Sequence, residues 1–179
     1  NDLTQRMMLG EDVTKQTSFG HTDLVRLKKS SINLQVLIIW VSELDSQYSC
    51  FDMAKKMYAK IESLSLIDNV EIPNSYDEIL NSFKNNHLSI PIGMEGGEAI
   101  ENKIENLYFF IEKGLFYFGP TWNHSLDWVS SGKDENYNKS KIKHLGLSDF
   151  GVEVIKTCEE NDVLIDVSHI GEKSFWDIN

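Results

Sequence analysis

Apolar residues in this chain gather in short runs that polar clusters separate. The runs are rich in β-branched and aromatic residues, a composition typical of strands buried in a sheet. The pattern predicts strands at residues 32–42, 88–94, 115–119 and 163–169.

Between these runs, apolar residues recur three or four positions apart, which is the spacing of one helix face. The spacing predicts helices over residues 48–64, 75–83, 98–113, 148–161 and from 172 onward. Ser75 with Glu78 three residues later is typical of a capping box, and Gly114 is a helix stop. The polar stretch 121–146 predicts a solvated loop between elements.

Strands and helices therefore alternate strictly, which predicts an α/β fold with a parallel sheet, either open or closed into a barrel. In both architectures function lies at the carboxyl ends of the strands. Four polar features fall at predicted strand ends: Asp2, Glu95, the segment 121–124 ("TWNH") and His169. We expect them on one rim of the sheet.

The composition of the chain excludes some classes of binding partner. The 179 residues carry a formal net charge of −11, which disfavours nucleic acid and anionic membrane surfaces. No apolar run approaches the roughly 20 residues that span a bilayer, and the first residues lack the pattern of a signal peptide. Two cysteines build no disulfide framework, so we expect both to be reduced in a cytoplasmic protein.

Metal binding is the chemistry that these rim residues favour. Asp2, Glu95 and His169 offer two carboxylates and an imidazole, a donor set suited to Zn²⁺ or Mn²⁺. Glu95 could equally complement the dipole of the helix that follows it, and His169 could be a hydrogen-bonded structural histidine. Asp166, within the same predicted strand as His169, fits a structural hydrogen-bonding role better than a ligand role. Two glycines after Glu95 are interpreted as leaving room for ions and substrate.

The order of several segments takes the interpretation further. "EGG" after a strand, "GLSDFG" opening a helix and "LIDVSH" on the next strand follow one another with "GHTDL" upstream. In this order the chain resembles the membrane (renal) dipeptidase family of zinc metallopeptidases, from Asn1 to Ile178. The resemblance implies a fold of the (β/α)8 TIM-barrel type, metallo-dependent hydrolase-like. Such a barrel needs about 250 residues, so residues 1–179 are expected to form the N-terminal part of a single catalytic domain, incomplete at both ends, with about its first five strands.

The resemblance also implies roles for individual residues. Asp2 matches the aspartate of a His-x-Asp metal pair whose histidine would precede Asn1. Glu95 matches the glutamate that bridges two Zn²⁺ ions, and His169 matches a histidine ligand of the second ion. Trp122 stands where mammalian members carry a substrate-facing histidine, and Asn123 matches a pocket asparagine, so both are expected to bind substrate.

What the resemblance implies for activity is hydrolysis of dipeptides. A hydroxide held between the two zinc ions would attack the peptide carbonyl, with Glu95 as the catalytic shared carboxylate. A homodimer is also implied. Two alternatives remain: a catalytically inactive barrel homologue that acts as a binding module, and another strand-end metallohydrolase. Residues 1–179 alone are expected to be inactive.

Overall fold

The centre of the molecule is a parallel sheet of four strands. A computed structural model describes residues 3–41 and 47–179. All neighbouring strands are parallel, as predicted, and their order is β1 (Leu37–Ile39), β4 (Ile92–Glu95), β5 (Leu115–Gly119) and β6 (Leu164–Ile165). A separate parallel pair is formed by β2 (Val70–Glu71) and β3 (Leu88–Ser89).

Helices connect and flank the strands. The α-helices are α1 (Leu3–Met8), α2 (Leu24–Lys29), α3 (Cys50–Glu62), α4 (Tyr76–Lys84), α5 (Ile104–Glu112), α6 (Gly132–Tyr137), α7 (Asp149–Glu160) and α8 (Glu172–Ile178). Short 3₁₀ helices occur at η1 (Ser63–Leu66), η2 (Gly97–Ile100) and η3 (Lys139–Lys141). None of the helices in the described ranges is long and apolar enough to cross a membrane.

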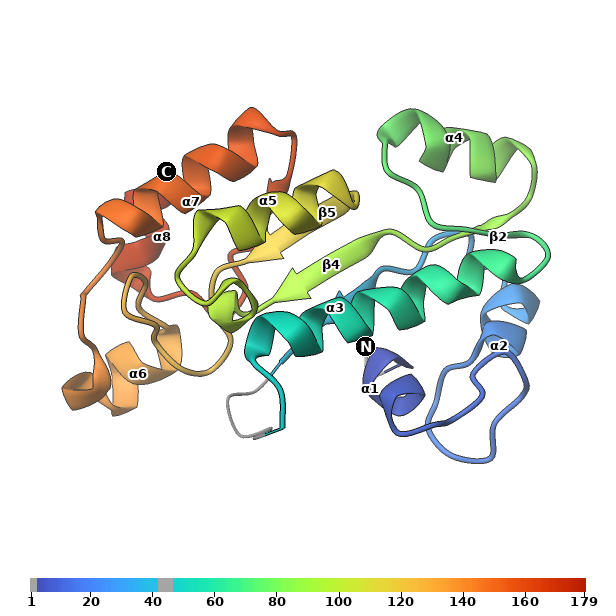
Figure 1. The fold of residues 1–179 in the computed structure, drawn as a ribbon, viewed down its shortest axis with the longest axis horizontal. Coiled ribbons are helices and arrows are strands. Elements are labelled where there is room, and N and C mark those ends of the chain that lie inside the picture. The colour runs from blue at the N-terminus through green and yellow to red at the C-terminus, as the bar shows by residue number, and fades with distance from the viewer. Residues whose placement is uncertain (1–2, 42–46) are drawn as a thin grey trace.

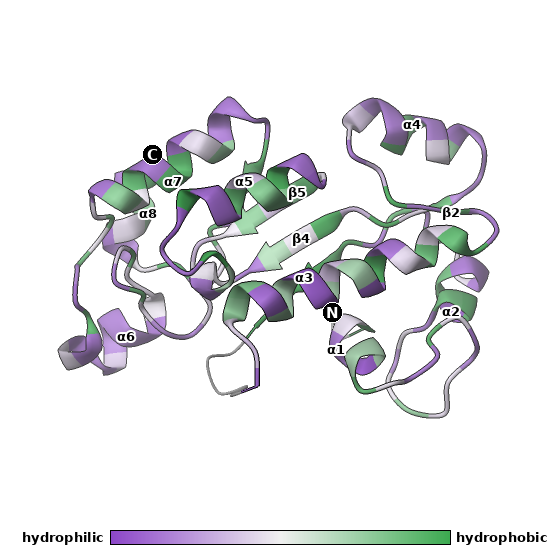
Figure 2. Cartoon of the chain, viewed as in Figure 1, coloured by the Kyte–Doolittle hydropathy of each residue, from purple (hydrophilic) through white to green (hydrophobic). Residues whose placement is uncertain are grey.

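One face of the sheet is covered by helices. Helix α3 packs on β1, α5 on β5 and α7 on β6, and α5 also contacts α7 (Figure 1). The strand residues on this outer face, among them Ile39, Met94 and Phe118, have no exposed surface. Hydrophobic residues concentrate in the strands and on parts of the covering helices, whereas α6 and most loops are hydrophilic (Figure 2). The main core therefore lies between the sheet and these three helices.

The opposite, inner face carries the residues that matter for the site. Parallel partners share a face, so the register places Gly93 beside Tyr117 and Tyr117 beside Leu164. Two residues further along these strands, and on the same face, Glu95 is paired with Gly119 at the carboxyl end of the sheet. The strands thus deliver Glu95 to the rim where the sequence predicted it.

Three predicted strands are shorter in the structure than the apolar runs that predicted them. The run 32–42 forms a three-residue strand and one bridge, Leu34 to Ser89. The run 88–94 breaks at Pro91, which has no N–H to donate, so that β3 pairs with β2 and β4 pairs with β1 and β5. At the third, 163–169, only Leu164–Ile165 is paired.

The predicted helices at 48–64, 75–83, 148–161 and from 172 onward are confirmed, whereas two other predictions were wrong. The predicted helix at 98–113 begins as η2 and then stops, because Glu101 and Asn102 adopt left-handed backbone angles before α5 starts. The polar stretch 121–146, predicted to be loop, contains α6 and η3. Helices α1 and α2 and strand β2 were not predicted.

Candidate metal site at the carboxyl end of the sheet

Glu95 and His169 meet at the rim of the sheet although 74 positions separate them. Glu95 is the last residue of β4, and His169 follows β6 after a turn. The His169 Nε2 atom lies 3.1 Å from Glu95 Oε1, with the two side chains 37% and 31% exposed. Both side chains therefore remain open to solvent, ions and small molecules while they face one another.

The backbone after β6 is shaped to aim His169 at Glu95. His169 has a φ of 65°, in the left-handed region that residues with a side chain rarely adopt. Its carbonyl accepts hydrogen bonds from the Gly132 amide at 2.8 Å and the Thr121 hydroxyl at 3.3 Å. Asp166 accepts from the Ser168 amide at 2.9 Å, which closes the turn just before the histidine. Asp166 thus has the hydrogen-bonding role that the sequence favoured.

The phenol of Tyr117 lies on the inner face of the sheet, near the carboxylates of Glu95 and Asp166. Tyr117 lies across Gly93, where an added Cβ would come within 2.5 Å of the tyrosine Cζ. Burial raises the pKa of Tyr117 to about 12, and the carboxylates of Asp166 and Glu95 add to this increase. Two carboxylates near one phenol create a field that favours a cation at this end of the sheet.

Trp122 forms an aromatic wall beside the pair. Its ring centroid lies 6.5 Å from that of His169 and 5.0 Å from that of Trp40, which it meets edge to face. Asn123 follows in the same loop, half-buried, and its carbonyl accepts a hydrogen bond from Ser131 at 3.2 Å. The structure therefore brings Trp122 to the site. Trp40 was missed because its approach depends on the register of β1 with β4.

The two glycines after Glu95 serve packing, which corrects their interpretation as an open approach. Gly96 has a φ of 96°, a conformation that glycine adopts without strain. Gly97 is buried, and a Cβ there would come within 2.5 Å of Trp128 Cζ2 and 2.9 Å of the Pro120 carbonyl oxygen. Both glycines let the chain turn tightly and pack closely after the strand.

The Glu95–His169 pair fits a metal ion in chemistry and spacing. Carboxylate oxygen and imidazole nitrogen bind zinc at about 2.0–2.2 Å, so two such donors on one tetrahedral ion stand roughly 3.3 Å apart. The observed separation of 3.1 Å is close to that value. Asp2, the third predicted ligand, lies outside the described residues, and within the described ranges no group of three or more His, Cys, Asp or Glu could hold a metal. The described residues thus contribute a pair of donors.

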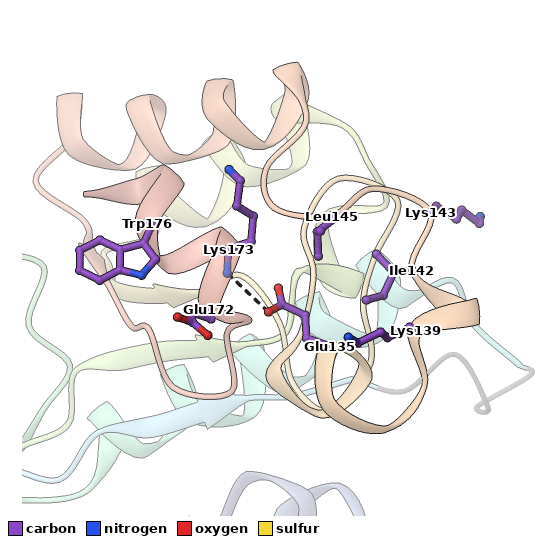
Figure 3. A pocket seen from close by; sticks show the side chains of 8 residues that line it. All are labelled: Glu135, Lys139, Ile142, Lys143, Leu145, Glu172, Lys173 and Trp176. Carbon is purple, nitrogen blue, oxygen red and sulfur yellow. Dashed lines mark hydrogen bonds between the residues drawn. The ribbon is translucent and has the colours of Figure 1, made fainter.

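A cavity of about 580 Å³ lies elsewhere, between α8 and the segment that follows α6 (Figure 3). Its lining includes Trp176 and Leu145, and two of its lysines form ion pairs: Lys173 with Asp177, and Lys143 with Asp127. None of the predicted site residues lines it. Its volume alone does not make it the functional site.

Comparison with known families now gives the site a context. A profile of the membrane dipeptidase family (peptidase family M19) matches residues 2–179. The chain belongs to this family. Among membrane dipeptidase relatives, Dipeptidase 3 from Mus musculus is 27% identical over 158 residues, which is 86% of this chain and 30% of that protein. A protein encoded in the PQQ-III 3′ region of Acinetobacter calcoaceticus is 34% identical over 108 residues, 60% of this chain and 34% of that one.

Solved structures of metallopeptidases share the fold, one of them described as a member of family M19. The metallopeptidase dipeptidase AC superposes with a TM-score of 0.84 at 21% identity, over 99% of this chain and 57% of that one. A Rhodobacter sphaeroides metallopeptidase, solved with a phosphinate mimic of the dipeptide L-Ala-D-Ala, gives 0.83 at 19% identity, over 99% and 59%. These likenesses confirm the TIM-barrel fold class expected from the sequence. The chain spans about a third of the length of its curated relatives and somewhat under 60% of these structures.

Proposed function

We propose that the protein is a metal-dependent dipeptidase and that Glu95 and His169 are two of its zinc ligands. The observation that carries the proposal is the 3.1 Å approach of Glu95 Oε1 to His169 Nε2 at the carboxyl end of a parallel sheet. Membership of the membrane dipeptidase family supports a peptide substrate. The phosphinate dipeptide mimic bound by the Rhodobacter sphaeroides relative supports a substrate of two residues.

The side chains of the site have separable tasks in this proposal. Glu95 and His169 would hold zinc together with Asp2, and bound zinc would make a water molecule nucleophilic at neutral pH, since zinc lowers the pKa of water from about 15.7 to about 7. His169 holds its imidazole Nε2 atom toward Glu95, so that both could bind one ion. Trp122 limits the space beside the ligands, and Asn123 offers an amide to the substrate.

Replacing Glu95 by Gln in the full-length protein tests the proposal. The amide keeps the shape but removes the negative charge, so it binds cations much more weakly. Because loss of outer-shell partners alone costs about 10–100-fold in metal affinity, loss of this ligand should cost more. We expect elemental analysis to find about two zinc ions per chain in the parent protein and a marked loss in the Glu95→Gln variant, together with loss of dipeptide hydrolysis.

Glu112→Gln is the matched control, because Glu112 is exposed at the end of α5 and lies on a covering helix. It should keep both zinc and activity. If Glu95→Gln retains zinc and hydrolyses dipeptides at the parent rate, Glu95 is only a helix-terminus acid and the proposal fails. Full zinc loading without hydrolysis of any dipeptide would instead support an inactive binding module.

A further inference from the structure

Both ends of one loop close on the carbonyl oxygen of His169. The loop runs from Thr121, just after β5, to Gly132, the first residue of α6. The Gly132 amide donates to His169 O at 2.8 Å. The Thr121 hydroxyl lies 3.3 Å from the same oxygen and 3.2 Å from the Trp122 carbonyl, so the two acceptors share one hydrogen.

The residues just beyond His169 are paired with the same loop. Ser131 and Ile170 form an antiparallel bridge, and the Gly171 amide donates to the Ser130 carbonyl at 2.8 Å. Since Gly132 donates on the other side of this bridge, the main chain of 169–171 is held by hydrogen bonds on both sides of Ile170. This pairing leaves His169 little freedom to leave its left-handed conformation.

A cluster of hydrogen-bonded side chains, Ser130, Glu135 and Ser174, lies next to the bridge between Ser131 and Ile170. The Ser130 hydroxyl donates to Glu135 Oε1 at 2.5 Å and lies 2.9 Å from the Ser174 hydroxyl. The other Glu135 oxygen accepts from the Lys173 amide at 3.4 Å, the interaction drawn in Figure 3. Ser130 and Ser174 are fully buried, so α6, α8 and the loop are tied together where water cannot compete.

We infer that Thr121 is a positioning residue for the metal site. Its side chain is fully buried and is the one side-chain donor that the described residues supply to the His169 carbonyl. It acts through His169: by helping to fix the carbonyl, it fixes the backbone that directs the imidazole to Glu95. The same loop carries Trp122 and Asn123, so the Thr121 hydroxyl links the backbone of the proposed metal ligand His169 to the loop that holds the proposed substrate-binding residues. The inference rests on the proposed function, because it takes His169 as a ligand.

Thr121→Val in the full-length protein tests the inference, because valine keeps the shape and removes the hydroxyl. Zinc affinity is measured by competition with a chelator, and the visible spectrum of the Co²⁺-substituted protein reports ligand geometry without reference to activity. We expect zinc affinity to fall about tenfold, the lower end of the range for loss of an outer-shell partner, with an altered Co²⁺ spectrum. Thr121→Ser restores the hydroxyl and should restore both readouts.

Gly132→Ala perturbs the same carbonyl independently. Its methyl would lie 3.1 Å from the Ile170 carbonyl oxygen and 3.6 Å from that of His169, so the bridge must shift by a few tenths of an ångström. It should also weaken zinc binding, and it decides the question if Thr121→Val does not fold. A parent protein that binds zinc, with Val and Ala variants that bind it equally well and give the parent Co²⁺ spectrum, overturns the inference alone. A parent protein that binds no zinc overturns the proposed function and the inference with it.

Discussion

Adding one methyl group at Gly97 should destabilise the protein, because the space that it needs is already filled. A Cβ at this position would lie 2.5 Å from Trp128 Cζ2, 2.9 Å from the Pro120 carbonyl oxygen and 3.0 Å from Leu126 Cδ1. Trp128 is 2% exposed and packs edge to face on Phe150 with ring centroids 5.7 Å apart, so it has no room to move away. The methyl group must therefore displace the backbone at the start of η2.

The expected size of the effect follows from this crowding. Overpacking a filled core typically costs about 1–3 kcal/mol, and each kcal/mol lowers the melting temperature of a domain of this size by about 2–4 °C. For Gly97→Ala we expect a loss of about 2 kcal/mol and a melting temperature about 4–8 °C lower. Thermal unfolding followed by circular dichroism measures it.

Gly119→Ala is a suitable comparison, because Gly119 is also buried but its nearest neighbour would be the Met94 carbonyl oxygen at 3.3 Å. It should lose less stability than Gly97→Ala. The reasoning is refuted if Gly97→Ala melts with the parent protein. A variant with unchanged stability and weakened zinc binding would revive the view that Gly97 keeps the approach to the site open.

Two further predictions concern titratable groups away from the site. Burial raises the pKa of the Cys158 thiol to about 12, so we expect Cys158 in the folded protein to react with iodoacetamide far more slowly than the half-buried Cys50. Mass spectrometry of the labelled peptides measures the two rates. Equal labelling would contradict it. A hydrogen bond from Ser82, and next one from His87, lowers the pKa of the Glu71 carboxyl below its usual 4.5. The ionised carboxylate therefore stabilises the folded protein above pH 4.5, and this stabilisation is lost as the pH falls through the lowered pKa. Urea unfolding should therefore show Glu71→Gln less stable than the parent at pH 6 and converging with it in acid; a difference that is constant with pH would refute the assignment.

The sequence predicted the rim of the sheet because strand ends follow from local pattern. Glu95 comes directly after an apolar run and His169 ends the predicted strand 163–169, and the carboxyl ends of parallel strands meet at one edge. The sequence therefore predicted that the two side chains lie near one another, but it could not predict their separation of 3.1 Å. The sequence placed Thr121 on the rim only as part of the segment 121–124 and did not predict its contact with His169, which comes from a residue 48 positions away. Tyr117 was not identified, since its place near the pair depends on strand register.

Other failures have specific physical causes. The helix predicted from residue 98 stops at Glu101, whose backbone is left-handed and whose carboxylate accepts a hydrogen bond from the Phe51 amide at 3.0 Å, at the start of α3. Such a contact between distant segments leaves no trace in local periodicity. Helix α6 did have a local signal: Ser131 caps it by accepting the Asp134 amide, a Ser-x-x-Asp pattern inside the polar stretch.

The break at Pro91 has a consequence for how the molecule opens. On one side of it the Ile90 amide donates to Glu71 of β2, and on the other the Pro91 carbonyl accepts from Leu37 of β1. Residues 33–35 also hydrogen-bond to Ser89 of β3 and lead into β1, so the unit β2–α4–β3 is joined to the central sheet through this short segment. Strand β2 itself pairs with β3 and not with the central sheet, so the unit β2–α4–β3 can lose its pairing while β4 keeps β1 and β5 (Figure 1). Amide hydrogens of that unit should then exchange with solvent as a separate cooperative group, faster than those of Gly93 and Met94. Insertions between Val70 and Asn86 should therefore change the structure of this unit and leave the position of Glu95 unchanged.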